Sequence, residues 1–374
     1  MALQKTLQAL FLTRNHSVSQ SRRELNNQAY RQTNAMQYVP VVDFDQRPLM
    51  PTTPARAERW IKSRKATPFF RKGVFCVRLN VQPSTRHTQP VAVGIDPGSK
   101  REGYTVKSKA HTYINQQFHA VDWVKDAEEA STNARRARRY RKTPYRPNRQ
   151  NRKRGGIPPS TKARWQIKIR VVKVLAAIFP ISHIGIEDVK ATTKKGSKTW
   201  NTSFSPLEVG KQWCYSELEK IAPVTKFDGY HDTFLTRQEL SLKKSKAKLS
   251  NDFKAHCVDS WVLAYLLVGG GSFPENTTVM ECKQIRIYRR QLHVFNPGKD
   301  GNRRPYGGSM SQGLKRGGIV KHPKYGKCYV GGEDAKKSRI SLHSLDTGKR
   351  LCQNAKPTDC KFLAYNSWRT VKPS

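Results

Sequence analysis

Three carboxylates of this 374-residue chain follow patterns that suit metal-dependent chemistry. Asp96 ends the apolar run VAVGI, Glu187 ends the apolar run SHIGI, and Asp259 lies in a third, longer apolar segment. Converging carboxylates repel one another unless a cation lies among them, and their hard oxygen atoms suit Mg²⁺ or Mn²⁺. The pattern therefore predicts a metal centre made of Asp96, Glu187 and Asp259.

Such a centre suggests phosphodiester cleavage. Two metal ions about 3.5–4 Å apart activate a water molecule and stabilise the leaving oxygen of a phosphodiester. His256 precedes Asp259 by three residues, which places both on one face of a helix. We expect His256 to position or deprotonate the attacking water, or to steady the scissile phosphate.

Each of these residues also has an ordinary structural explanation. Asp96 stands before Pro97-Gly98 and suits a turn, and Glu187 suits the start of a helix. His256 suits a packed core position, and Asp259 an exposed surface. The joint order of strand-Asp, strand-Glu and helical H-x-x-D is more specific than any single motif.

The elements that must position these residues alternate between strands and helices. Strands are expected at 91–95, 104–106, 111–114 and 182–187, with a further strand and loop in 225–233. The first three form a meander. A helix is predicted at 161–179, and another at 255–268 that stops at Gly269. This order predicts a mixed α/β layer architecture.

The charge of the chain points to a polyanionic partner. Lys and Arg number 70 against 27 Asp and Glu, for a formal net charge of +43, while 36% hydrophobic residues suffice for a core. No apolar run approaches the ~18 residues of a membrane span. Nucleic acid is the partner that this composition favours.

One basic stretch is free of acids. No Asp or Glu occurs between Ala130 and Ile186, and STNARRARRYRK opens the stretch. On a helix, Arg135, Arg138, Arg139 and Lys142 form one basic stripe, with Ser131 or Thr132 as a cap at its start. Arginines suit phosphate because their guanidinium groups donate two parallel hydrogen bonds.

The two ends of the chain differ from its centre. Residues 286–374 contain 20 Lys or Arg against 5 Asp or Glu, with glycine-rich turns between short strand-like runs, which predicts a basic β-rich domain. Residues 1–35 faintly resemble a transit peptide, although a disordered extension explains their composition better. The seven cysteines form no CxxC pair, and we expect reduced thiols in a cytoplasmic, nucleoid-associated protein.

The acidic motifs together resemble those of RuvC-type nucleases, a branch of the RNase H-like fold. VGIDPGSK (93–100) resembles the first motif of that family, IGIEDVKA (184–191) the second and AHCVD (255–259) the third. An arginine-rich helix between the first two motifs resembles the bridge helix of RNA-guided nucleases. The resemblance implies that Asp96, Glu187 and Asp259 hold two Mg²⁺ ions, for which Mn²⁺ can substitute, with His256 as the catalytic histidine.

Other segments are similar to the IscB and IsrB families of the transposon-encoded OMEGA systems. RRARR (135–139) matches the RRXRR signature, and RPLMPTTPAR (47–56) resembles the PLMP segment that opens those proteins. WNTSFSPLEVGKQW (200–213) and RRQLH (289–293) also look like IsrB-type sequence. IscB carries an HNH nuclease between the second and third RuvC motifs. The 69 residues from Glu187 to His256 hold no readable H-N-H triad, so the resemblance is to the IsrB type, an RNA-guided nickase.

This resemblance implies partners and contact residues. Guide (omega) RNA or the guide–target heteroduplex would contact Arg135, Arg136, Arg138, Arg139, Arg141 and Lys142. The C-terminal domain would read a short motif beside the target in double-stranded DNA, with Arg289, Arg290, Arg303, Arg304, Lys315 and Arg316 as candidates. We expect one protein chain in each ribonucleoprotein.

The resemblance also implies a division of the chain. The expected parts are an extension (1–36), a PLMP-like domain (37–85), a RuvC-I part (86–125), an arginine-rich bridge helix with basic linker (126–176), RuvC-II and RuvC-III parts (177–285) and the basic β-rich domain (286–374). Two alternatives remain open at this point. One is a guide-independent, structure-selective nuclease such as a junction resolvase, and the other is a non-catalytic RNA-binding protein.

Overall fold

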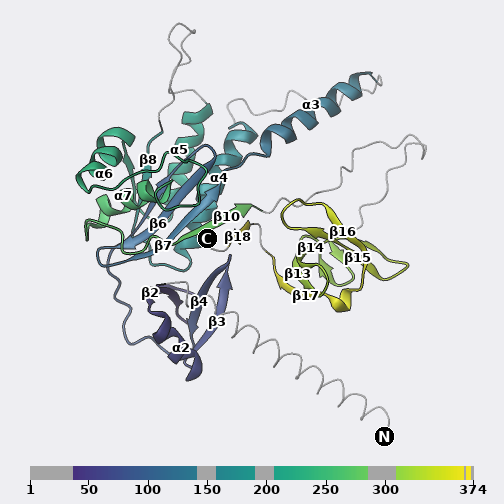
Figure 1. Cartoon of the computed structure of the whole chain (residues 1–374), viewed down its shortest axis with the longest axis horizontal. Helices are drawn as coiled ribbons and strands as arrows, with labels where there is room; N and C mark the ends of the chain where they lie inside the picture. Colours follow the sequence, from purple (N-terminus) through teal and green to yellow (C-terminus); the bar gives the residue numbers. More distant parts are fainter. Residues whose placement is uncertain (1–36, 141–156, 190–205, 285–308, 366–367, 372–374) are drawn as a thin grey trace. The chain divides into compact units, whose positions relative to one another are not determined.

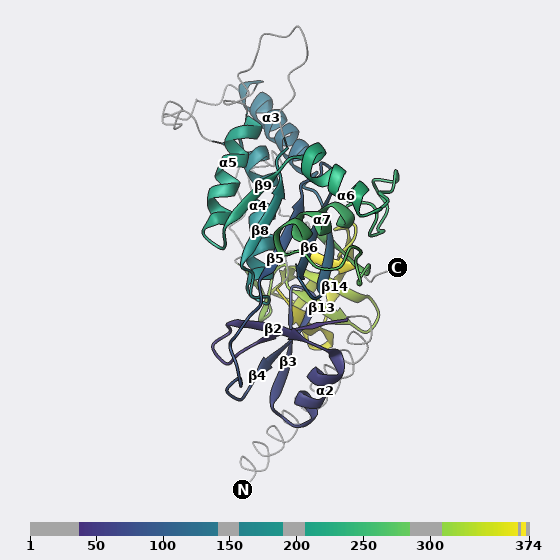
Figure 2. The ribbon, with the colours of Figure 1, turned by 90° about the vertical axis from the view of Figure 1, so that its left-hand side faces the viewer.

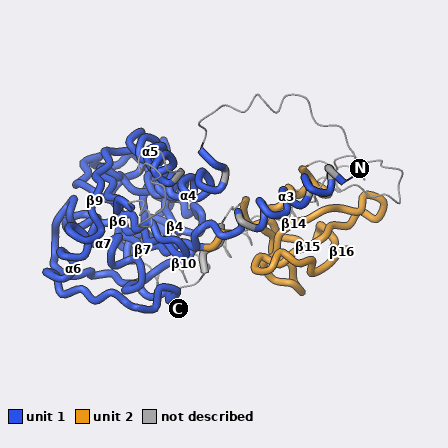
Figure 3. The backbone as a smooth tube through the Cα atoms, turned by 90° about the horizontal axis from the view of Figure 1, so that it is seen from above, with its two compact units in different colours: residues 1–282, 371–374 blue, residues 283–370 orange. Residues whose placement is uncertain are grey.

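A computed structural model describes residues 37–140, 157–189, 206–284, 309–365 and 368–371. The chain separates into two compact units (Figure 3). The first comprises Met1–Cys282 with Val371–Ser374, and the second comprises Lys283–Thr370. The predicted metal-centre residues all belong to the first unit.

The first unit begins with a small four-stranded sheet, ordered β2-β1-β4-β3 (Figure 1). Its strands are β1 (Val39–Val42), β2 (Pro48–Thr52), β3 (Ala66–Arg71) and β4 (Val74–Leu79), with helix α2 (Pro54–Lys62) between β2 and β3. Pro54 opens α2, a position that suits proline because the first helical N–H has no partner within the helix. Ala57 of α2 is buried against Phe75 and Val77, so this segment has its own core.

A seven-stranded sheet has the order β18-β10-β7-β6-β5-β8-β9, and its strands β5 to β9 lie wholly in the first unit. Its strands are β5 (Val91–Asp96), β6 (Arg101–Ser108), β7 (Thr112–His119), β8 (His183–Glu187), β9 (Val224–Phe227), β10 (Val279–Gln284) and β18 (Trp368–Val371). The first three make the predicted antiparallel meander. Strand β8 then pairs in parallel with β5, and β9 pairs in parallel with β8.

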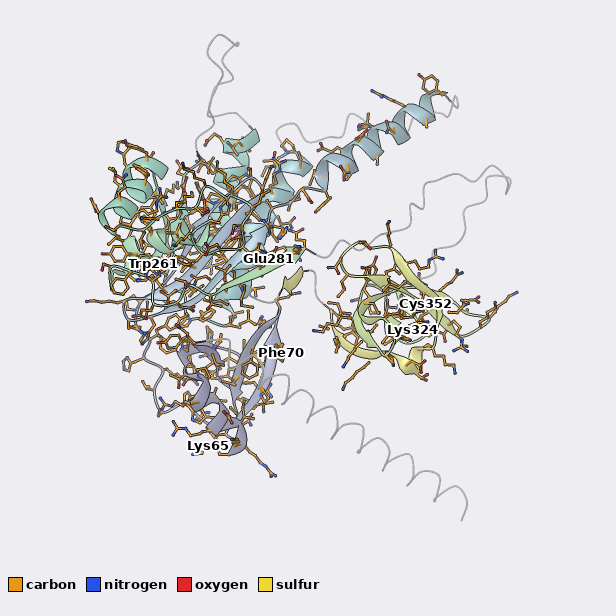
Figure 4. The ribbon with its side chains drawn as sticks, viewed as in Figure 1. Lys65, Phe70, Trp261, Glu281, Lys324 and Cys352 are labelled. Atoms are coloured by element: carbon orange, nitrogen blue, oxygen red, sulfur yellow. The ribbon has the colours of Figure 1, made fainter. Side chains whose placement is uncertain are left out.

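Helices connect these strands. They are α3 (Val124–Tyr140), α4 (Pro159–Ala176), α5 (Pro206–Glu219), the π-helix η3 (Gly229–Phe234), α6 (Leu235–Glu239) and α7 (Cys257–Val268). Helix α4 packs on α5, while α7 lies against β5, β6 and β8 (Figure 2). Figure 4 labels Trp261 of α7, which is buried and stacks on Tyr265 with ring centroids 5.4 Å apart.

Glycine permits the close approach of α7 to the sheet. A Cβ atom on Gly94 of β5 would overlap the carbonyl oxygen of Ser260, and one on Gly103 of β6 would overlap that of His256. Because both glycines lack a side chain, the first turn of α7 can pack directly on β5 and β6. This packing places Asp259 near the end of β5.

The second unit is rich in strands, as its composition predicted. A five-stranded antiparallel sheet has the order β16-β15-β14-β13-β17. The elements are β11 (Met310–Ser311), β12 (Leu314–Lys315), β13 (Ile319–His322), β14 (Gly326–Asp334), β15 (Arg339–Ser344), β16 (Arg350–Ala355), the 3-10 helix η5 (Pro357–Asp359) and β17 (Lys361–Ala364). Val320, Val330 and Leu342 lie in its small core.

Two local expectations were wrong. The arginine-rich helix begins at Val124, so Ser131 and Thr132 lie inside it and do not cap its start; Thr132 Oγ1 donates to the Glu128 carbonyl. The helix extends toward its N-terminus because VKDAEEA contains helix-favouring residues and an acid in the first turn. The segment after β9 is the π-helix η3 followed by α6, where a loop was expected.

Two other expectations agree with the structure. All seven cysteines are free thiols, five of them buried. Among the described residues, none of the helices combines the length and the apolar character needed to cross a lipid bilayer.

Candidate metal centre at the ends of β5 and β8

The three predicted carboxylates lie together. Ile95 of β5 pairs with Ile186 of the parallel strand β8, so Asp96 and Glu187 are the next residues on two adjacent strands. Asp259 comes from the first turn of α7. One carboxylate oxygen from each residue lies within 4.8 Å of the others, and this is the one such group of three or more acids, histidines or cysteines among the described residues.

This geometry fits a divalent cation. Mg²⁺ binds oxygen ligands at about 2.0–2.1 Å, so ligands on opposite sides of one ion lie about 4.2 Å apart. The separation of up to 4.8 Å needs only small movements of the side chains to reach that value. Asp96 and Asp259 are buried, which leaves little water to compensate their charges in the absence of an ion.

The pKa of Glu187 reports the crowding of negative charge. Burial is the largest cause that raises the pKa of the Glu187 carboxyl. Together with the charges of Asp96 and Asp259, which outweigh that of Lys244, it brings the pKa to about 7. A bound divalent cation relieves that repulsion and favours the ionised form. The residues present therefore suit Mg²⁺ or Mn²⁺.

His256 is the N-cap residue of α7, so it does not share a helical face with Asp259 as the i, i+3 spacing predicted. Its backbone φ of −134° lies outside the helical range because the preceding residues approach α7 from a loop. The side chain still reaches the centre: Nδ1 lies 2.9 Å from Asp96 Oδ2, and Nε2 lies 3.1 Å from the Lys248 carbonyl.

Both ring nitrogens of His256 thus face oxygen acceptors, which suits the doubly protonated imidazolium. Burial alone would lower the pKa of His256, but the hydrogen bond and charge of Asp96 outweigh it and raise the pKa. The arrangement favours a cationic His256 that orients Asp96 or steadies a phosphate. It is less suited to removing a proton from water.

Two further cations contact the centre, and sequence reasoning missed both. Arg237 Nη1 donates to Asp259 Oδ1 at 2.6 Å, and Lys244 Nζ donates to Asp259 Oδ2. Burial lowers the pKa of Lys244, yet the charges of Asp259 and Asp96 outweigh this effect and raise it. These residues belong to a lysine- and arginine-rich stretch, TRQELSLKKSKAK, in which nothing marks one cation from another.

Asp188 adjoins Glu187 but faces away from the centre, as the alternation of side chains along a strand predicts. Its Oδ1 accepts hydrogen bonds of 2.8 Å from Lys211 Nζ and from the Tyr215 hydroxyl. Both partners belong to α5. Asp188 therefore fastens α5 to the end of β8 and does not contribute a ligand to this cluster.

The predicted nucleic-acid contacts are partly described. Arg135 and Arg136 are exposed on α3, and Arg135 Nη2 donates to Thr132 Oγ1. Lys315 Nζ lies 5.3 Å from the Tyr365 ring centroid, and Arg316 donates to Ser311 Oγ. Arg141, Lys142, Arg289, Arg290, Arg303 and Arg304, together with the side chains of Arg138 and Arg139, lie outside the described residues.

Solved structures similar to this chain include two of Thermus thermophilus RuvC and one of a yeast enzyme. RuvC in complex with a Holliday junction substrate is 14% identical, with a TM-score of 0.25, over 48% of this chain and 97% of that one. A second RuvC structure is 16% identical, with a TM-score of 0.22, over 48% and 96%. The yeast mitochondrial Holliday junction resolvase is 14% identical, with a TM-score of 0.24, over 48% and 78%.

Sequence comparison adds a family. No curated protein matches the chain. Residues 39–203 match the RRXRR protein family. This segment contains the small sheet, the meander, α3, α4 and β8, and hence both strand-end carboxylates. Residues 39–203 are therefore similar to the RRXRR protein family, and the chain joins a mixed α/β region to an additional β-rich part.

Proposed function

We propose that this protein is a nuclease that hydrolyses phosphodiesters with the help of a divalent metal ion. The observation that carries the proposal is the convergence of Asp96, Glu187 and Asp259 at the ends of adjacent strands and the start of α7. A protein that only binds nucleic acid gains nothing from three carboxylates placed where they repel phosphate. Bound Mg²⁺ would supply water activation and stabilisation of the leaving oxygen.

The residues of the chain have separate roles in this proposal. Asp96, Glu187 and Asp259 hold the metal. His256 orients Asp96 and, as a cation, steadies the scissile phosphate. Arg237 and Lys244 orient Asp259 and balance its charge before the metal enters.

We further propose that the cleavage is a nick, directed by RNA. The single carboxylate cluster among the described residues supports cleavage of one strand at a time. The match of residues 39–203 to the RRXRR family, the exposed arginines Arg135 and Arg136, and the net charge of +43 support a large RNA partner. Pairing between guide RNA and target would supply specificity, and the β-rich second unit would read a short adjacent motif in the DNA duplex.

The test begins with sequencing of the RNA that copurifies with the full chain. A common scaffold with a variable end supports guidance, and a chain free of bound RNA contradicts it. In the next step, the full chain with its RNA is incubated in Mg²⁺ with a supercoiled plasmid that carries the matching target. We expect nicked circles, which are lost in EDTA and in Asp96→Ala. Linear plasmid would contradict the proposed single-strand cut.

The same preparation separates the two alternatives. Cleavage of four-way junctions by RNA-free protein would indicate a structure-selective nuclease. Unchanged Mn²⁺ affinity after combined replacement of Asp96, Glu187 and Asp259 by alanine would indicate a protein that only binds RNA.

A further inference from the structure

The π-helix η3 presents an exposed aromatic ring beside the metal centre. Tyr230 is 60% exposed, although its ring stacks on Phe234 with centroids 5.3 Å apart and planes inclined by 15°. His231 contacts the same ring edge-on, with centroids 5.2 Å apart. We call Tyr230 and Phe234 the aromatic shelf. Because Phe234 supports one face of Tyr230, a flat ring is held in place with its remaining surface open to solvent.

The aromatic shelf is joined to the metal centre at both ends. Gly229, the residue before Tyr230, lies so close to Glu187 that a Cβ atom there would be 2.6 Å from Glu187 Oε1. At the other end, the Arg237 guanidinium lies 5.4 Å from the Phe234 ring centroid and donates to Asp259. A group that lies on Tyr230 is therefore a neighbour of whatever the carboxylates hold.

The backbone of η3 is fixed by its own acids. Asp228 Oδ1 accepts the N–H groups of Tyr230 and His231 at 2.9 and 3.1 Å. Asp232 Oδ2 accepts the N–H of Asp228 at 2.6 Å. A rigid aromatic platform loses little conformational entropy when a ligand stacks on it. The same two acids disfavour a phosphate at the shelf, so an uncharged planar group fits better there.

Phosphates have a separate, lysine-rich surface at the centre. The loop after α6 carries Lys243, Lys244, Lys246 and Lys248, with no acid from residue 240 to residue 251. This loop reaches the centre through Lys244, which binds Asp259, and through the Lys248 carbonyl, which contacts His256. Bases on an aromatic platform and phosphates along lysines are the two halves of a single-stranded nucleic-acid site.

We propose that Tyr230 stacks on an unpaired nucleobase next to the phosphate held at the carboxylates. This inference rests on the proposed nuclease function. The occupant is one base of the strand being cut, and stacking accepts any base because every base has a π face. Tyr230 is thus a positioning residue: it sets which phosphate reaches the metal centre and requires the strand to be unpaired there.

The experiment uses the full chain with single-stranded DNA in which 2-aminopurine replaces one base at a time. Ca²⁺ replaces Mg²⁺ for binding, because its loose coordination holds the strand without the near-octahedral geometry of Mg²⁺. Parallel reactions in Mg²⁺ map the cut. We expect 2-aminopurine fluorescence to be quenched at the one or two positions that flank the mapped cut.

Three variants identify the ring responsible. Tyr230→Ala should abolish that quenching and weaken oligonucleotide binding about fivefold or more, in line with the loss of one stacked base. Tyr230→Phe should preserve both properties because the ring remains. Phe273→Ala is the matched control: Phe273 is 70% exposed and follows the opposite end of α7, so quenching and affinity should not change.

The outcomes separate this inference from the proposed function. If the chain cuts DNA but Tyr230→Ala shows the same quenching at every position, the shelf assignment is overturned while the nuclease stands. If neither this DNA nor the plasmid with the matching target is cut in Mg²⁺, the nuclease proposal fails, and the quenching still reports stacking. Mn²⁺ affinity of Tyr230→Ala should equal that of the unsubstituted chain. A parallel loss of metal affinity would overturn the inference, since the effect would then arise from a disturbed centre.

Discussion

His256 Nδ1 lies 2.9 Å from Asp96 Oδ2, although 160 residues separate them along the chain. The contact joins the last residue of β5 to the N-cap of α7. It therefore couples the orientation of a carboxylate of the candidate metal centre to the packing of a helix on the sheet. The loop that carries the Lys248 carbonyl completes the support of the imidazole ring.

Replacing His256 by alanine should slow cleavage more than it weakens metal binding. The imidazole contacts Asp96 without belonging to the carboxylate cluster, so the ligands remain. Loss of a positioned acid–base or cationic group typically slows a reaction about 10²–10⁴-fold. Single-turnover cleavage rates and Mn²⁺ titration calorimetry measure the two effects. An equal loss in both would show that His256 only maintains the fold of the centre.

Glu187→Gln should stabilise the metal-free chain at pH 8 and abolish stabilisation by metal. The pKa of Glu187 is raised to about 7, so the folded state binds its proton more tightly than the unfolded state does. Protonated Glu187 therefore stabilises the folded state. This contribution is fully present below the pKa of the unfolded state, near 4.5, and is lost as the pH rises through about 7. After allowance for solvent, we expect a difference on the order of 2 kcal/mol.

Urea unfolding in EDTA at pH 5 and pH 8 measures this effect for both proteins. Ionisation of Glu187 should lower the free energy of unfolding of the unsubstituted chain between pH 5 and pH 8. Glu187→Gln should lack this loss, and Mg²⁺ should restore stability only to the unsubstituted chain. Parallel pH profiles of the two chains would contradict the prediction.

Lys244→Met should tighten metal binding. Lys244 donates to Asp259 Oδ2, and Arg237 occupies the other oxygen, so an entering cation competes with Lys244 for its ligand. Removal of that competition should raise Mn²⁺ affinity severalfold in titration calorimetry. Lys246→Met is the matched control, because Lys246 is an exposed lysine of the same loop. Weaker binding in Lys244→Met would mean that Lys244 helps to hold Asp259 in place for the metal.

Gly94→Ala should destabilise the first unit strongly. A Cβ atom there would overlap the Ser260 carbonyl oxygen and lie 2.9 Å from the Ala264 nitrogen, both backbone atoms of α7. Forcing α7 away from β5 should cost about 3 kcal/mol and lower the melting temperature by about 6–12 °C. Gly271→Ala is the control, because the nearest atom to its Cβ would be 4.0 Å away. Equal melting temperatures of the two variants would refute the close-packing explanation.

Much of the centre could be predicted because its signals are local. Two apolar runs that each end in an acid predicted strands β5 and β8, and the parallel pairing of Ile95 with Ile186 places those acids side by side. A third acid in an apolar helix completed the cluster. The first residue of α3 could not be predicted from the sequence, because the residues before Ser131 favour a helix as strongly as those after it.

The sequence by itself determined the chemical inventory: three carboxylates in a fixed order, an arginine-rich helix and a basic excess that favours a polyanionic partner. These follow from residue type and periodicity, which depend on neighbours in the chain. Only the tertiary structure selected Arg237 and Lys244 from many cations and set the ring of Tyr230 on Phe234. It also raised the pKa of Glu187. These contacts and the raised pKa depend on distances between elements that sequence spacing does not specify. The distance between α7 and the sheet, for example, is short because Gly94 and Gly103 leave room for the backbone of α7.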